Sequence, residues 1–262
     1  MISEPATLEL HGAVAVVTLN DPRRRNILTG PLVSAIAAAM DRAESTDEVR
    51  CVVLTGAGAA FCAGAELATL RGAADGDFES VEYVYQGFLR VRESPLPTIA
   101  AVNGPAVGAG FNLALACDVR LAGPDASFDT RFAALHLHPG GGHAWMLARA
   151  VGAQRATLAC LFGEVWDAPA ALEAGLVAAV TDADVVAAAI ALGNRLADQE
   201  RPYVERVIGT LRDSLSTLDH GDALAAETEA QRWSASRPTF RDGVRAIEER
   251  IARRKSGDTP VS

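Results

Sequence analysis

The sequence predicts a mixed α/β fold whose last third is helical. Short apolar runs alternate with segments of helical periodicity over the first two thirds of the chain. At two junctions between a strand and a helix the chain uses a Gly-Ala pair, Gly64-Ala65 and Gly108-Ala109. Beyond about residue 182 the strand-like runs cease and helical patterns follow one another. We therefore expect an α/β core over residues 1–182 and a helical region over residues 183–262.

The chain's composition suits one large domain with an appendage. It has 262 residues, 49% of them hydrophobic, and a net charge of -9, which argues against nucleic acid or an anionic membrane as the main partner. The sequence shows neither a secretory leader nor an apolar run of membrane-spanning length, so we expect a cytoplasmic protein without a membrane span. Its four cysteines are widely spaced and form no CxxC pair, which predicts reduced, buried thiols.

The N-terminal part predicts a hairpin, a helix and a buried strand. Residues 8–10 and 14–19 read as two strands joined by His11-Gly12. Thr29-Gly30-Pro31 then begins a helix, with the proline near its first position. Residues 49–54 form the next apolar strand, which runs into the first Gly-Ala turn.

The middle and the end of the chain continue this alternation. The polar, glycine-containing stretch 71–80 predicts a mobile loop, and residues 128–137 are ambiguous. A second strand–turn–helix unit spans residues 98–117, and another strand spans residues 119–122. Further helices are expected over residues 81–92, 143–150, 185–197, 203–215, 223–233 and 244–254.

The two Gly-Ala turns indicate an oxyanion site. The first N–H groups of a helix lack intrahelical acceptors, and the helix dipole favours negative charge there. Two such ends that face one cavity can hold a single carbonyl oxygen as it becomes an oxyanion. Removing one donor of that kind typically costs about 2.7–4 kcal/mol of barrier. Glycine and alanine would also be explained by tight packing of helix on strand.

Three common nucleotide or hydrolase motifs are missing. The chain contains no GxGxxG, no GxxxxGK[ST] and no GxSxG. Nicotinamide-binding, P-loop and serine-hydrolase activities therefore lack their defining residues.

Several short motifs occur together in a recognisable order. They are Asn20-Asp21-Pro22 through Asn26, residues 60–67, residues 100–104 with Gly108-Ala109-Gly110, Cys117-Asp118, Ala122-Gly123, residues 139–142 and residues 174–177. With these motifs nearly the whole chain resembles the enoyl-CoA hydratase/isomerase (crotonase) superfamily. The resemblance implies a spiral of ββα units with a C-terminal α-helical trimerisation region, and a homotrimer or a hexamer. It also implies an acyl-CoA substrate or ligand and no further cofactor or metal.

The resemblance further implies roles for individual residues. The N–H groups of Ala65 and Ala109 would bind the thioester oxygen, in a site that includes Ala63, Gly64 and Gly108. Leu67 and Leu135, with Leu70 and Trp145, would line the acyl pocket, although core packing would also explain them. Arg25, in the run Arg23–Arg25, would contact a phosphate of CoA, although a solvated turn would also explain this run. Gly140 stands where aroyl-CoA dehalogenases of the superfamily carry a nucleophilic aspartate.

The two glutamates that hydratases of this superfamily use are replaced. Their positions fall on Asn112 and Phe132, and neither side chain exchanges a proton near neutral pH. We therefore expect ordinary hydration to be impaired, because each positioned acid or base contributes about 10²–10⁴-fold.

A nearby histidine could replace these glutamates, since His143 follows His136 and His138 around residues 139–142. Packing in a loop or an interface would also explain all three histidines, and their spacing does not indicate a metal site.

Two functions follow. One is an enzyme that stabilises an enolate with unusual acid and base groups. The other is a non-catalytic acyl-CoA carrier or sensor.

Overall fold

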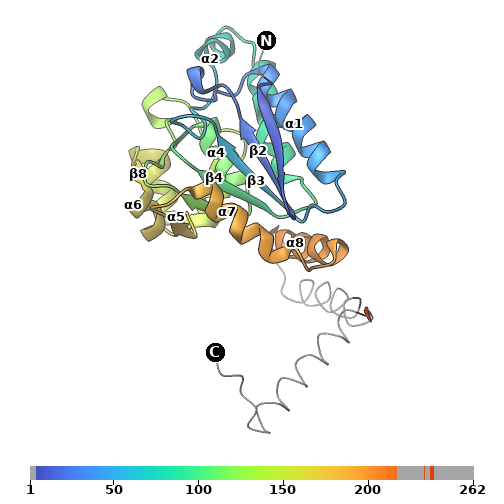
Figure 1. Ribbon diagram of the computed structural model, residues 1–262. Coiled ribbons are helices and arrows are strands. Elements are labelled where there is room, and N and C mark those ends of the chain that lie inside the picture. Colours follow the sequence, from blue (N-terminus) through green and yellow to red (C-terminus); the bar gives the residue numbers. More distant parts are fainter. Residues whose placement is uncertain (1–3, 217–232, 234–236, 239–262) are drawn as a thin grey trace. The chain divides into compact units, whose positions relative to one another are not determined.

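The computed structural model describes residues 4–216, 233, 237 and 238 (Figure 1). The chain divides into two compact units, Met1–Arg201 and Pro202–Ser262. Helix α7 (Val185–Gly193) belongs to the first unit, and α8 (Arg201–Ser216) forms most of the described part of the second. The boundary that we expect at residue 182 separates an α/β core from a helical region and is not the boundary between these two units. It stays a prediction.

A six-stranded sheet runs through the first unit in the order β1-β2-β3-β4-β6-β9. The predicted hairpin is confirmed, because β1 and β2 are antiparallel and His11 pairs with Val14. The other neighbouring strands are parallel. The strands are β1 (Ala6–His11), β2 (Val14–Leu19), β3 (Cys51–Gly56), β4 (Thr98–Val102), β6 (Val119–Ala122) and β9 (Ala179–Val180).

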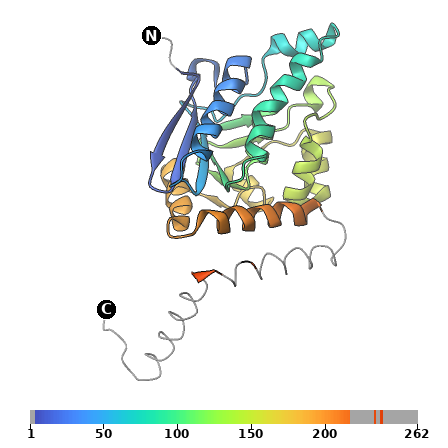
Figure 2. The same cartoon turned by 90° about the vertical axis from the view of Figure 1, so that its right-hand side faces the viewer.

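The side chains of this sheet alternate between two apolar layers. Val17 and Leu54 belong to the large core that includes α1 (Gly30–Glu44) and α3 (Glu79–Arg92). Val16 and Val53 belong to a smaller cluster with Val185 and Ala189 of α7, so α7 packs on the opposite face. Figures 1 and 2 show α1 and α3 together on one side of the strands. The predicted α/β class is therefore confirmed for this unit.

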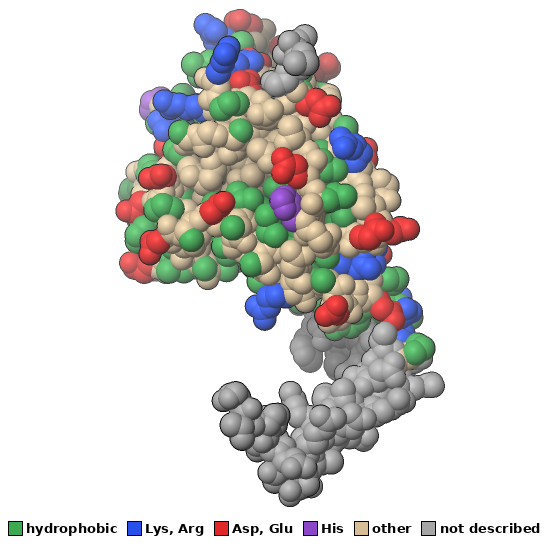
Figure 3. Space-filling view, in the orientation of Figure 1, with side chains coloured by type: hydrophobic (Ala, Val, Ile, Leu, Met, Phe, Trp, Pro, Cys, Tyr) green, Lys and Arg blue, Asp and Glu red, His purple; other side chains and the backbone are tan. Residues whose placement is uncertain are grey.

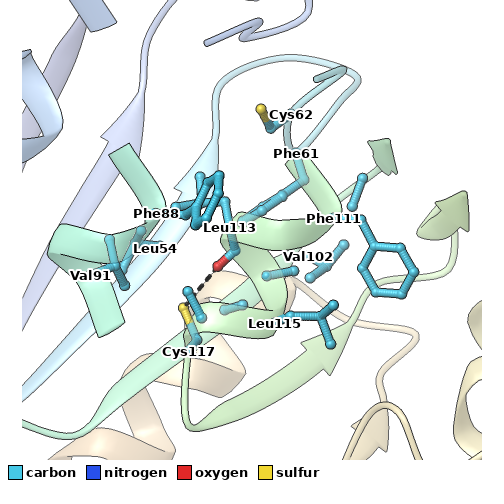
Figure 4. Packing of buried hydrophobic residues seen from close by; sticks show 14 of the residues in the cluster. Leu54, Phe61, Cys62, Phe88, Val91, Val102, Phe111, Leu113, Leu115 and Cys117 are labelled. Carbon is cyan, nitrogen blue, oxygen red and sulfur yellow. Dashed lines mark hydrogen bonds between the residues drawn. The ribbon is translucent and has the colours of Figure 1, made fainter. Parts of the chain in front are cut away.

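A second, three-stranded sheet joins β5 (Pro105–Val107), β7 (Ser127–Asp129) and β8 (Trp166–Asp167). Strand β4 leads through β5 into α4 (Ala109–Ala116), which makes one ββα unit. All residues of α4 after the first are buried. Figure 4 shows α4 among Phe61, Phe88 and Val102, with the Cys117 thiol directed at the Leu113 carbonyl oxygen.

Most predicted helices are confirmed, but the loop predicted over residues 71–80 was wrong. The stretch 71–80 is helical at both ends, since α2 (Leu67–Ala74) ends inside it and α3 begins there. Asp77 supports the start of α3, because its carboxylate accepts hydrogen bonds from the N–H and hydroxyl of Ser80. Helix α5 (His143–Phe162) has non-helical backbone at Gly152, which separates a first segment, matching the helix predicted over residues 143–150, from a second one that ends at Phe162.

The remaining described segments form short elements. Residues 128–137 contain the end of β7 and a 3₁₀ turn, η2 (Ala133–Leu135). The other short elements are η1 (Pro22–Arg24), α6 (Ala168–Glu173) and η3 (Asn194–Leu196). The helices predicted over residues 223–233 and 244–254 lie outside the described residues, apart from Trp233. Within the described part of the chain, no helix has the length and apolar composition needed to cross a bilayer.

Candidate active site

The two Gly-Ala turns lie directly against each other. The Cys62 N–H donates to the Pro105 carbonyl oxygen at 3.1 Å, and the Val107 N–H donates to the Cys62 carbonyl oxygen at 3.0 Å. Gly110, in the first turn of α4, packs so closely on this strand-like segment that a Cβ would lie 2.0 Å from the Cys62 oxygen. Because residue 110 is a glycine, the start of α4 can pack against the first turn.

Each turn then presents one amide to the same place. Gly64 has φ +98°, and a Cβ there would lie 2.8 Å from the Val107 oxygen and 3.8 Å from the Ala109 nitrogen. Ala65 follows Gly64, and Ala109 is the first residue of α4. Among the described residues, neither the Ala65 N–H nor the Ala109 N–H has a hydrogen-bond acceptor. Both residues line one cavity, so two donors without acceptors meet at its wall.

Two asparagines hold the turns in shape. Asn26 is completely buried, and its amide group donates to the carbonyl oxygens of Ala57, Ala60 and Phe61 at 2.9–3.3 Å. Asn103 accepts a hydrogen bond from the Gly56 N–H and donates one to the Gly58 oxygen. Both residues belong to the motifs noted in the sequence, and the structure explains them as supports for backbone that is otherwise irregular.

The cavity has a volume of about 670 Å³, within the usual size range of small-molecule sites. Its wall is mostly apolar and comes from α2, α3, the two turns and the segment 130–140. The sequence-predicted residues that line it are Ala63, Gly64, Ala65, Leu67, Gly108, Ala109, Asn112, Phe132, Leu135 and Gly140. No aspartate or glutamate lines it among the described residues.

The α3 wall of the cavity was missed from the sequence. Val81, Val84 and Tyr85 of α3 line the cavity, as does Phe78 just before the helix. Positions 81, 84 and 85 follow the i, i+3, i+4 pattern of one helix face. The sequence shows this apolar face of the helix. It does not show whether the face packs on the core or lines a cavity.

Asn112 is buried and tied to two partners. Its Oδ1 lies 2.5 Å from His143 Nδ1, and its Nδ2 donates to the Gly140 carbonyl oxygen at 3.1 Å. Since the amide nitrogen is used on Gly140, the oxygen must accept, and His143 carries its proton on Nδ1. The second Asn112 N–H stays available on a residue that lines the cavity.

His143 lies behind the cavity wall. Its side chain is fully buried, and its Nε2 has no partner among the described residues. The rings of Phe132 and Phe111 meet its imidazole edge-on, with centroids 5.0 and 5.3 Å away. Burial lowers the pKa of His143 to about 4, so the imidazole is neutral at pH 7.

The other two histidines lie apart from His143. His138 lines the cavity, with Nδ1 2.8 Å from the Pro139 oxygen, and His136 is exposed. Arg131 also lines the cavity and pairs with Asp129 at 2.6 Å. In the part of the chain that the structure describes, no three histidine, cysteine or acidic side chains cluster as a metal site.

The basic run Arg23–Arg25 and the nearby Glu66 do not line the cavity. Arg25 is exposed, and its carbonyl oxygen accepts from the Ala63 N–H at 2.9 Å. Arg24 pairs with Glu66, which stands at the N-cap of α2 but makes no capping hydrogen bond with its side chain. Figure 3 shows basic side chains near α2 at the top of the view and acidic ones scattered over the rest of that face.

Cys62 lies under the first turn as an inert thiol. It is fully buried, and burial raises its pKa to about 12. Cys51 and Cys117 are buried in the same way, with pKa values raised to about 12. A thiolate at any of these positions is therefore not populated near pH 7.

Comparisons with known proteins agree with this architecture. A family profile described as "Enoyl-CoA hydratase/isomerase" matches residues 9–255. The chain is 46% identical over 253 residues to the Mycobacterium tuberculosis H37Rv protein named "Probable enoyl-CoA hydratase EchA14", with 94% of this chain and 98% of the relative covered.

Solved structures show the same fold. A crystal structure of an enoyl-CoA hydratase from Bacillus anthracis superposes with a TM-score of 0.87 at 28% identity, covering 94% of this chain and 96% of that one. A Thermobifida fusca YX protein crystallised in complex with CoA has a TM-score of 0.77 at 30% identity, covering 89% and 93%. From the profile match, the identity and the shared fold, the chain belongs to the enoyl-CoA hydratase/isomerase (crotonase) family.

Proposed function

We propose that this protein binds an acyl-CoA and polarises its thioester carbonyl between the N–H groups of Ala65 and Ala109. The observation that carries the proposal is the pair of donors without acceptors on one apolar cavity. Such donors stabilise negative charge as it develops on the carbonyl oxygen, so an enolate or oxyanion forms more easily. The largely apolar surroundings strengthen each of these hydrogen bonds.

The reaction type is that of an enoyl-CoA hydratase/isomerase with unusual proton-transfer groups. Asn112 and Phe132 stand where the family resemblance places glutamates, and no carboxylate lines the cavity among the described residues. We expect ordinary water addition to be slow for that reason. His143 acts as a positioning residue, since its hydrogen bond fixes the Asn112 amide with an N–H free for the ligand.

Other residues contact the acyl group and the CoA part of the ligand. Leu67 and Leu135 contact the acyl group, and Gly140 and Phe132 complete its wall. Arg25, exposed beside the first turn, contacts a phosphate of CoA, while Arg24 is engaged by Glu66. The CoA complex of the Thermobifida fusca relative supports a CoA ligand. No other cofactor is expected.

The assembly and location are proposed from the family resemblance. We expect a homotrimer or a hexamer in the cytoplasm. Light scattering coupled to size exclusion would give the oligomer mass directly.

Hydration of crotonyl-CoA tests the proposed chemistry. Crotonyl-CoA should bind the wild-type protein, while its hydration should be at least about 10²-fold slower than in a variant set that restores both carboxylates. The variants are Asn112→Glu, Phe132→Glu and the double substitution, and calorimetry with CoA thioesters reports binding separately. Rapid wild-type hydration would contradict the assignment of Asn112 and Phe132.

The alternative function is a non-catalytic acyl-CoA carrier or sensor. It predicts tight thioester binding without turnover in hydratase, isomerase, decarboxylase and thioesterase assays. If the wild-type protein shows turnover in one of these assays, and a His143→Ala variant shows less, the protein is an enzyme and not a carrier or sensor.

A further inference from the structure

The two turn amides of the proposed oxyanion site are supported in different ways. Ala109 begins α4, and every later residue of that helix is buried, so packing fixes the Ala109 amide. Ala65 leads through Glu66 into α2, where none of residues 67–73 is buried and Leu67 is 70% exposed. Figure 1 shows α2 at the top of the view, beyond the ends of the strands. The position of the Ala65 amide therefore depends on contacts other than the burial of its helix.

One such contact holds the carbonyl end of the peptide group. The Ala65 N–H belongs to the same peptide group as the Gly64 carbonyl, and the Leu28 N–H donates to this carbonyl oxygen at 2.7 Å. Gly64 has φ +98° and no side chain, so its backbone turns easily. A single hydrogen bond at the oxygen lets the group rotate about that point. An attachment on the chain after Ala65 would remove this freedom.

An ion pair supplies that attachment. The Glu66 carboxylate pairs with the guanidinium of Arg24, which lies in the loop between β2 and α1. Glu66 is the N-cap residue of α2, where the helix dipole favours negative charge, yet its side chain makes no capping hydrogen bond. The carboxylate is thus directed to the loop and not to its own helix.

The loop side of the pair is well fixed. The Asp21 carboxylate accepts a hydrogen bond from the Arg24 N–H at 3.3 Å. The Asp21 N–H donates in turn to the side-chain oxygen of the fully buried Asn26 at 2.9 Å. An ion pair as exposed as that of Arg24 with Glu66 contributes little to the stability of a fold. Its main effect is therefore local, since it ties the residue after Ala65 to a fixed loop.

We propose that Glu66 is a positioning residue, whose ion pair with Arg24 keeps the Ala65 N–H directed at the thioester oxygen. This inference rests on the proposed function, in which that oxygen binds the Ala65 and Ala109 amides. Leu28 holds the peptide group before the amide, and the ion pair holds the chain after it. Glu66 acts through the backbone and does not itself contact the ligand.

The proposal separates polarisation of the thioester from its binding. Without the Glu66 carboxylate the Ala65 amide turns away, so the thioester oxygen keeps one well-placed donor and is polarised less. The same change removes a negative charge beside the run Arg23–Arg25, so attraction of the CoA phosphates does not weaken. A residue with a merely structural role would lose polarisation and affinity together.

Infrared difference spectroscopy of bound butyryl-CoA, labelled with ¹³C at the thioester carbonyl, tests this separation. Two hydrogen bonds should lower the carbonyl stretching frequency in the wild-type complex relative to the free ligand. The shift should be smaller in Glu66→Ala and in Arg24→Ala, and no smaller in the double variant, because both changes remove the same pair. Calorimetry should give Glu66→Ala an affinity no lower than that of the wild type.

Two further variants separate the pair from general effects. Arg24→Lys keeps a positive charge opposite Glu66 and should retain most of the wild-type shift. Arg71→Ala is the matched control, since Arg71 is exposed in the last turn of α2 and lies outside the pair. It weakens the favourable interaction of that charge with the helix dipole and should keep the full shift.

The possible failures are distinguishable. A wild-type shift in both Glu66→Ala and Arg24→Ala would overturn the positioning role and leave the proposed function standing. An equal reduction in Arg71→Ala, or a loss of affinity that accompanies the reduced shift in Glu66→Ala, would also overturn it, in favour of a structural role. A wild-type protein that does not bind butyryl-CoA, or binds it without a shift, would contradict the proposed function itself.

Discussion

At the scale of single residues, Asn112 shows where sequence reasoning ends. Its position could be predicted, because the motif around Gly108-Ala109-Gly110 places it one turn into a helix. Its partners could not be predicted, since His143 is 31 residues away and the hydrogen bond depends on how α4 and α5 pack. The sequence indicates His143 as a substitute acid or base, whereas the structure places it behind the wall, bonded to Asn112. We infer a positioning role from that placement.

The buried state of His143 predicts a dependence of stability on pH. Its pKa is about 4 in the folded protein, against an ordinary value near 6.5, so the unfolded chain binds this proton more readily. The stabilisation is complete above about pH 6.5 and is lost as the pH falls toward 4. Between pH 7.5 and 5 the free energy of unfolding should fall by about 2 kcal/mol more in the wild type than in His143→Gln.

Urea unfolding at the two pH values measures this difference. His138→Gln is the matched control, because it removes a histidine that is exposed and not buried. An identical loss of stability in the wild type and in His143→Gln would show that His143 does not take up a proton on unfolding.

At the scale of elements, the turns were the most predictable part of the site. Gly64 and Gly110 are needed where backbone meets backbone, and such constraints are visible in the sequence as small residues at fixed places. Helix α2 was less predictable, because the polar residues and glycines around it resemble a loop. Its leucines instead line the cavity, which gives the segment an apolar side to fold against.

A proline at the first position of α4 tests the Ala109 donor. Proline is accepted at this place in helices, because the N–H it removes has no intrahelical acceptor. Ala109→Pro should therefore keep the fold and lower kcat by about 10²–10³-fold for any thioester that the protein turns over. Steady-state kinetics measure the effect, and circular dichroism checks the helix content.

Ala109→Gly is the control for this variant, since it changes the side chain and keeps the N–H. It should remain within a few-fold of the wild type. Equal activity of Ala109→Pro and Ala109→Gly would remove Ala109 from the proposed oxyanion site.

At the scale of the whole described unit, the cavity lies where several layers meet. The alternation of side chains along β2 and β3 predicts two apolar faces, and the structure fills them with α1 and α3 on one side and α7 on the other. That α3 would also supply a cavity wall depends on how helices far apart in the sequence pack. The alternation of strands and helices therefore predicts the fold class, while the composition of the cavity had to come from the structure.

The central claim is that the Ala65 and Ala109 amides together bind a thioester oxygen. The most direct measurement is a crystal structure of this protein with a bound, unreactive acyl-CoA such as butyryl-CoA. The thioester oxygen should lie about 2.7–3.1 Å from both amide nitrogens, with the acyl chain directed toward Asn112. A bound thioester whose oxygen contacts neither amide would contradict it.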